Sequence, residues 1–248
     1  MVPIDRFAAY DETRRSLQGF VRGLDRDELG TTVPACPDWS VKDALAHVVA
    51  EAEIAVTGSL PPDLDLIQAL RDEGHAARRE AMNARLVAAR RDRTVAELLS
   101  EWDGLFEQLA PMLRGERPFP YPFPSVDSVV VMDVALHSQD IRNALGRPGE
   151  RDTDAVRLGM SAYTVGADNK IRLMGLPPLR FRYDGREKVI GGDGEPAATL
   201  TADRYELYRA LASRRSRDQI RGMDWDGDPG PYLAAIPMYG ERDEPLSE

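Results

Sequence analysis

Cysteine is nearly absent from this chain of 248 residues: Cys36 is the single one, so no intramolecular disulfide can form. A lone thiol is typical of proteins in reducing compartments. The sequence also lacks any run of the roughly 18–20 apolar residues that a membrane-spanning helix requires. Residues 1–6 lack the basic segment and apolar run of a signal peptide. We therefore expect a cytoplasmic protein without a membrane partner.

Basic residues are outnumbered by acidic ones. Lys and Arg total 32 against 42 Asp and Glu, which gives a net charge of -10 at pH 7. A surface with this balance repels phosphate backbones, so we expect no nucleic-acid partner. Hydrophobic residues make up 42% of the chain, the share of an ordinary globular protein that can bury a core. The length accommodates one large domain or two modest ones.

Helical periodicity dominates the first two-thirds of the chain. Apolar residues recur at helical spacing, and the expected helices span about residues 5–29, 40–56, 66–91, 94–113, 126–145 and 153–173. Ser40 with Asp43, and Thr94 with Glu97, have the spacing of capping boxes at two of the helix starts. Four prolines within residues 117–124 predict a loop.

Strand signals replace the helical pattern toward the C-terminus. We expect strands over residues 179–183 and 197–201, a turn at residues 184–185 and a helix over residues 205–213. The chain is therefore expected to be α+β. A helical bundle over residues 1–165 would be followed by a small α+β domain over residues 175–240.

Only three histidines occur, and two of them lie in helices that could meet. Asp133, His137 and Asp140 have the spacing i, i+4 and i+7, which places them on one helix face. His47 lies among apolar residues of an earlier helix, so its imidazole is expected to be buried. In a bundle, His47 could meet Asp133 and His137. Two nitrogens and one oxygen suit a divalent transition metal, zinc above all, and leave a position open for water or substrate.

Plainer explanations exist for each of these residues. A helical histidine is commonly a hydrogen-bonded core residue, and an Asp–His pair at i,i+4 can be a local ion pair. His75 lies in a charged helix and is expected at the surface. Cys36 has no base at a fixed sequence relation to it, so packing beside Trp39 is its expected role.

Two charged clusters in the tail are expected to be structural. Asp224, Asp226 and Asp228 alternate as in a calcium loop, but the Gly and the distal Glu of that loop are not at the required places. A basic cluster is expected to be a solvated helix end, formed by Arg214, Arg215 and Arg217.

Two segments carry a resemblance to a known family. Ala35–His47 and Asp133–Gly146 resemble the two motifs of the mycothiol-dependent maleylpyruvate isomerase family, which belongs to the DinB/YfiT-like metal-binding helical bundles. The resemblance extends in order and spacing over about residues 5–165. The tail is similar to the sterol-carrier-like α+β domain that often follows this bundle.

The resemblance implies a four-helix bundle with a divalent metal near one end. Its ligands would be His47, Asp133 and His137, with Asp133 in the place of a longer Glu, so that it reaches less far and could act through water. Asp140 would support the ligands by accepting from an imidazole N–H or from Arg142. Mycothiol would bring its sulfur to the open metal position, where the metal lowers the thiol pKa.

Three functions are compatible with these features. The first is a metal-dependent, mycothiol-using enzyme of isomerase or S-transferase type that acts on a small electrophilic metabolite. The second is a non-catalytic carrier with an apolar ligand pocket in the C-terminal domain, lined by Phe181, Tyr183, Tyr205, Tyr208 and Trp225. The third is a member that keeps the fold without activity. The substrate, the choice among zinc, nickel, iron and manganese, and the oligomeric state stay open.

Overall fold

The computed structural model describes residues 3–64, 73–120 and 125–248, and it divides into two compact units, Met1–Leu158 and Gly159–Ser247. Helices and a small sheet occur in each unit, which confirms the expected α+β class. The division falls within one helix, so each unit is described by itself. The domain ranges 1–165 and 175–240 stay a prediction.

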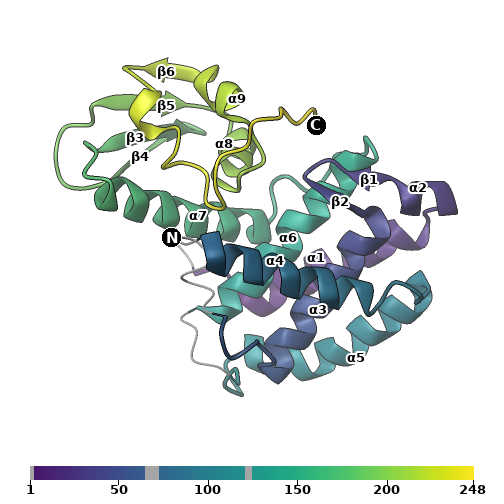
Figure 1. The fold of residues 1–248 in the computed structure, drawn as a ribbon. Coiled ribbons are helices and arrows are strands. Elements are labelled where there is room, and N and C mark those ends of the chain that lie inside the picture. Colours follow the sequence, from purple (N-terminus) through teal and green to yellow (C-terminus); the bar gives the residue numbers. More distant parts are fainter. Residues whose placement is uncertain (1–2, 65–72, 121–124) are drawn as a thin grey trace. The chain divides into compact units, whose positions relative to one another are not determined.

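Unit 1 is built around four long helices, α1 (Arg6–Arg22), α3 (Val41–Thr57), α5 (Val95–Leu113) and α6 (Val126–Ala144). α3 packs against α5 and α6, and α1 packs against the same two helices, so the four close a ring around a shared core (Figure 1). α4 (Glu73–Ala88) packs on α3. The arrangement puts α3 and α6, which carry His47 and His137, in direct contact.

The centre of this bundle is held by an aromatic pair. Trp102 on α5 has no exposed surface, and its indole N–H donates to the Tyr10 hydroxyl of α1 at 2.8 Å. The two rings meet edge to face, with centroids 6.4 Å apart. Because the indole N–H has its partner, the large Trp102 side chain fills the core without an unsatisfied polar group.

The helix that carries His47 begins where the sequence predicts. The Ser40 hydroxyl accepts the Asp43 N–H at 3.1 Å, and the Asp43 carboxylate accepts the Ser40 N–H at 3.0 Å. The same reciprocal pair starts α5 at Thr94. Both predicted capping boxes are therefore confirmed, and they set the register in which α3 and α5 present their side chains.

The single helix predicted over residues 5–29 is wrong. α1 ends at Arg22, and α2 (Arg26–Gly30) begins after Asp25, whose carboxylate accepts two N–H groups of its first turn. An Asp side chain that satisfies these N–H groups favours a new helix start over continuation. A hairpin of β1 (Thr32–Val33) and β2 (Cys36–Ser40) follows, where the sequence predicts only an interruption.

Two predictions fall partly outside the described residues. The helix expected over residues 66–91 is observed as α4, and residues 65–72 lie outside the described ranges. The loop expected over residues 117–124 is described as far as residue 120, where it has no regular helix or strand.

Unit 2 contains a four-stranded sheet in the order β4-β3-β5-β6. β3 (Leu179–Tyr183) and β5 (Ala198–Thr201) pair in parallel, which confirms both predicted strands. β4 (Arg186–Ile190) and β6 (Asp224–Asp226) are antiparallel edge strands that the sequence does not predict. β4 exposes its first four side chains, so it lacks the apolar alternation of a half-buried strand. The remaining elements are α7 (Asp154–Leu173), which crosses into this unit, α8 (Arg204–Leu211), α9 (Arg217–Arg221) and η2 (Gly230–Tyr232).

Several aromatic residues of unit 2 belong to its core. Phe181 and Tyr208 are fully buried, and Tyr205 is nearly so. Trp225 stacks on Tyr232 with centroids 6.3 Å apart and donates its indole N–H to the Ile220 carbonyl at 2.8 Å. Phe181, Tyr205 and Tyr208 therefore belong to the core of this unit, and the carrier function stays a prediction.

The charged clusters of the tail differ in outcome. The predicted solvated helix end is wrong for Arg214 and Arg215, which are buried. Arg215 donates to both oxygens of Glu206, at 2.7 and 2.8 Å, because a buried guanidinium requires a carboxylate partner. The aspartates at 224, 226 and 228 belong to neither group of residues that could hold a metal ion in the described part of the chain.

Asp168 on α7 fixes the loop after β4. Its carboxylate accepts the Arg172 Nε–H at 2.9 Å and the Gly191 N–H at 2.6 Å. Gly191 has a φ of +91°, and a Cβ there would lie 2.2 Å from Ile171 Cγ2, so only glycine lets the backbone approach. The bond to Arg172, followed by the one to Gly191, lowers the pKa of Asp168 below its usual value of 3.8.

Stability of the folded chain is therefore expected to depend on Asp168 in acid. Because the folded-state pKa is depressed, its stabilisation is present above the unfolded value of 3.8 and is lost as pH falls through the folded value. Asp168→Asn is expected to lower the free energy of unfolding by about 1–2 kcal/mol near neutral pH and to flatten its decline in acid. Urea titrations over a pH series measure both effects. The exposed Asp224→Asn is the control, and equal slopes in the two variants would contradict the assignment.

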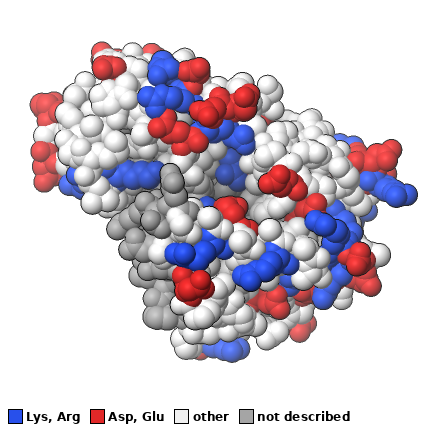
Figure 2. All heavy atoms as spheres, in the orientation of Figure 1, with Lys and Arg blue, Asp and Glu red and all other residues white. Residues whose placement is uncertain are grey.

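No helix among the described residues is long and apolar enough to cross a membrane. Acidic and basic side chains are interspersed over the face shown in Figure 2. The expected absence of a nucleic-acid partner stays a prediction.

Candidate metal centre

His47 and His137 meet between α3 and α6. His47 is 3% exposed and His137 is 6% exposed, and their ring centroids lie 4.7 Å apart with the planes at 79°. Buried apolar neighbours surround His47 along α3, as its sequence context predicts. Asp133 lies one turn before His137 on α6. The structure thus brings together all three residues that the sequence and the resemblance single out as ligands.

The two distances from Asp133 to the imidazoles are close to those between ligand atoms around a small cation. The Asp133 Oδ1 atom lies 3.6 Å from His137 Nε2 and 3.9 Å from His47 Nε2. One ligand atom from each residue lies within 4.8 Å of the others. Ligand atoms of a tetrahedral zinc, with bonds of about 2.0–2.1 Å, are about 3.3–3.4 Å apart. The Asp133 oxygen therefore needs to approach the imidazoles by only roughly half an ångström.

Each imidazole also has a carboxylate near its other nitrogen. His47 Nδ1 lies 4.0 Å from Glu51 Oε1, and His137 Nδ1 lies 3.3 Å from Asp140 Oδ2. Metal-binding histidines ordinarily have such an acceptor, which fixes the tautomer and the ring orientation. Within the described residues, neither Nδ1 atom makes a hydrogen bond of adequate geometry. Both rings therefore have an acceptor nearby while their Nδ1 atoms stay unsatisfied.

The electrostatics of this cluster favour a cation. Burial lowers the pKa of His47, but the contact with Asp133 and the charges of Asp133, Glu51 and Glu80 outweigh it, so the pKa is raised above 6.5. Burial raises the pKa of Glu51 to about 7; the charge of Asp133 acts in the same direction, and His47 opposes it. Negative charge is thus crowded around two imidazoles, and a bound divalent ion would relieve that crowding.

Trp39 on β2 forms a wall of the site. Its ring lies 4.7 Å from the His47 ring, tilted by 36°, and 5.9 Å from the His137 ring. The side chains of Asp133 and Glu51 keep 24% and 27% of their surface exposed, so solvent reaches the site from their side. Trp39 and Glu51 are site residues that the sequence did not predict. The signals for them are membership in the His47 motif and the i,i+4 spacing from His47.

The structure also places Arg142, which the resemblance implies as a residue near the ligands. Arg142 donates to the Ser16 hydroxyl at 2.8 Å, lies 3.5 Å from Glu150 and covers the Phe20 ring. Its predicted support of the ligands stays a prediction.

Cys36 is expected to pack beside Trp39, but its thiol belongs to a second group that could hold a metal ion, together with His137 and Asp140. Sequence spacing carries no signal for that approach, because the hairpin creates it.

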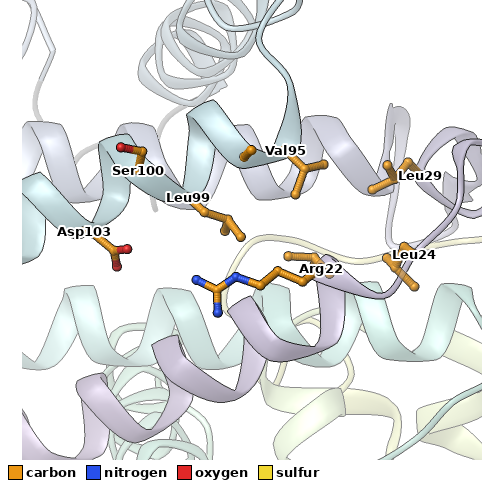
Figure 3. A pocket seen from close by; sticks show the side chains of 9 residues that line it. Arg22, Leu24, Leu29, Val95, Leu99, Ser100 and Asp103 are labelled. Carbon is orange, nitrogen blue, oxygen red and sulfur yellow. The ribbon is translucent and has the colours of Figure 1, made fainter.

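A separate groove of about 430 Å³ lies between the end of α1, α2 and the start of α5. In Figure 3 its apolar side chains, such as Leu24 and Leu99, lie beside Arg22 and Asp103. None of the residues that line the groove is His47, Asp133 or His137.

Comparisons with known proteins agree with this architecture. The sequence model of the mycothiol maleylpyruvate isomerase N-terminal domain matches residues 10–142, a segment that contains His47, Asp133 and His137. No curated protein matches the chain.

A similar fold occurs in a solved structure, the crystal structure of a histidine-to-alanine mutant of the mycothiol-dependent maleylpyruvate isomerase. The TM-score is 0.54 at 13% sequence identity, and the match covers 84% of this chain and 88% of that chain. The covered share exceeds that of unit 1 alone, so the likeness reaches into unit 2. At 13% identity this likeness shows a shared fold.

Proposed function

The chain belongs to the family of the mycothiol maleylpyruvate isomerase N-terminal domain, and from that premise we propose that it is a metal-dependent enzyme that uses mycothiol. Its reaction would be of isomerase or S-transferase type, on a small electrophilic metabolite. The observation that carries the proposal is the approach of His47, Asp133 and His137 to within 4.8 Å at a site with one solvent-facing side.

The residues present fit a divalent transition metal. Two neutral imidazoles and one carboxylate are donors that zinc accepts, and three protein ligands leave a position for an exogenous group. Nε2 of each imidazole lies near Asp133, and Nδ1 of each lies near a second carboxylate, which is the arrangement that orients a metal-binding imidazole. Zinc is therefore the metal we propose.

Different side chains of this chain would bind the ion, exclude water and admit substrate. His47 and His137 would hold the ion, and Asp133 would supply the third ligand directly or through a water. Trp39 would exclude water from the His47 side, while the exposed edge near Asp133 and Glu51 would admit substrate. A divalent ion held there would supply the Lewis acidity that keeps a thiol ionised at neutral pH.

The test is a thiol-dependent assay on zinc-loaded protein. Mycothiol is supplied with a panel of unsaturated acids, maleylpyruvate among them, and S-methyl mycothiol is the matched control because it lacks the free thiol. We expect turnover with mycothiol only, and loss of that turnover after chelation followed by recovery on adding zinc. Equal rates with and without metal, or with the S-methyl control, would refute the proposal.

A further inference from the structure

The two nitrogens of His137 face different groups. Nε2 lies 3.6 Å from Asp133, on the side of His47, whereas Nδ1 lies 3.3 Å from Asp140. Cys36 joins the second group: one ligand atom each of Cys36, His137 and Asp140 lies within 4.8 Å of the others. Because Asp140 lies beside Nδ1, we place the sulfur-containing group at this nitrogen, opposite the nitrogen that lies near Asp133.

The hairpin β1–β2 is what brings the thiol to α6. Cys36 opens β2 and pairs with Val33 of β1, and β1 packs against α6. Asp140 is fully buried in its side chain, while Cys36 is half-buried and so remains open to a small ion. A thiolate, an imidazole nitrogen and a carboxylate oxygen are all donors that zinc and its heavier relatives accept.

The geometry at Nδ1 indicates an incoming cation. Nδ1 of His137 is buried and, within the described residues, has no hydrogen bond of adequate geometry, although Asp140 is only 3.3 Å away. A proton on Nδ1 is thus poorly directed toward that carboxylate. An ion placed among Nδ1, an Asp140 oxygen and the Cys36 sulfur would give the buried Nδ1 atom a partner, because coordination requires these atoms to face one centre and not each other.

We propose that Cys36, His137 and Asp140 form a second cation site for a borderline-soft divalent ion. His137 would bind this ion through Nδ1, whereas its Nε2 belongs to the His47 site. Binding releases the proton of the Cys36 thiol and any proton on Nδ1, and forms bonds from sulfur, nitrogen and oxygen to the ion. The two sites share one imidazole, so an ion at Cys36 is coupled to the occupancy of the other site. The site goes beyond the proposed enzymatic function and does not require it.

Cadmium is the probe, because a thiolate bound to Cd²⁺ has a charge-transfer absorption that nitrogen and oxygen ligands lack. Zinc-loaded protein is titrated with CdCl₂, and the ultraviolet absorption is followed on the short-wavelength side of the aromatic band. We expect the band to saturate at one equivalent, to vanish in Cys36→Ser, and to need at least about 10-fold more cadmium in Asp140→Asn. His47→Ala should keep the band. Asp127→Asn, an acidic position on the same helix that pairs with Arg6, is the matched control.

Each other outcome overturns the site. No band in the wild-type chain means that the thiol does not bind the ion. An unchanged titration in Asp140→Asn means that the thiol binds alone, and loss of the band in His47→Ala means that there is one site and not two. The absorption band is independent of turnover. The band can therefore persist when mycothiol-dependent activity is absent, and activity can persist when the band is absent, so the two proposals fail separately.

A second measurement avoids variants that fail to fold. Alkylation of Cys36 by iodoacetamide is followed in the wild-type chain with and without one equivalent of cadmium. We expect at least about 10-fold slower alkylation with cadmium, since a coordinated thiolate is not free to react. An unchanged rate would overturn the proposal even if Asp140→Asn cannot be purified.

Discussion

Replacement of His47 by alanine is expected to reduce the zinc bound at its site from about one per chain to nearly none. The change removes one of three protein ligands, and loss of even an outer partner of a ligand ordinarily costs 10–100-fold in affinity, so the expected decrease exceeds about 100-fold. His137→Ala is expected to do the same. Elemental analysis of protein purified without a metal-binding tag, followed by zinc titration with a competing chelator, gives the stoichiometry and the affinity.

His75→Ala is the control for this experiment. His75 lies on α4 and outside both groups of residues that could hold a metal ion, so its loss should leave the zinc content unchanged. Asp133→Glu introduces a longer carboxylate, so we expect it to bind zinc at least as tightly as the wild-type chain does, whereas Asp133→Asn should bind zinc less tightly. An unchanged zinc content in His47→Ala, or equal losses of zinc in His47→Ala and His75→Ala, would contradict the proposed metal centre.

The largest effect on stability is expected at Trp102. Trp102→Ala removes a fully buried indole from the contact between α1 and α5 and leaves the Tyr10 hydroxyl without its donor. Large-to-small changes of this kind cost about 3–5 kcal/mol, because the lost burial is joined by the cavity that stays behind. Urea unfolding followed by circular dichroism measures the decrease in the free energy of unfolding.

Tyr10→Phe separates the hydrogen bond from the packing. It keeps the ring, which stacks on Phe106 with centroids 5.9 Å apart, but removes the acceptor of the Trp102 indole N–H. We expect a loss of about 1–3 kcal/mol, the cost of one unsatisfied buried donor. If Tyr10→Phe were as damaging as Trp102→Ala, the cavity would not be the main cause.

Most long helices of the bundle could be predicted because their signals are local. Capping pairs such as Ser40 with Asp43 act within one turn, and the apolar spacing of α3, α5 and α6 repeats several times. The errors occur where no repeat exists. α2 and the hairpin β1–β2 are too short for periodicity, and β4 stands at a sheet edge with charged side chains on both faces.

The candidate site divides along the same line. Asp133, His137 and Asp140 share one helix face, and Glu51 follows His47 by one turn, so sequence spacing alone is enough to relate the members of each pair or triplet. The approach of Trp39 and Cys36 depends on the hairpin and on its packing against α3 and α6, and a thiol close to an imidazole from a residue about a hundred positions away leaves no trace in local spacing.

The sequence by itself determined the α+β class, the main helices of the bundle, two strands of the second unit and the two helices that carry the histidines, because short-range periodicity and capping chemistry encode these. Only the tertiary structure decided that both imidazoles lie near one carboxylate, that an indole lies against them, and that Cys36 comes close to His137 and Asp140. Those relations arise from packing between segments distant in the chain, where the position of each side chain depends on all its neighbours at once.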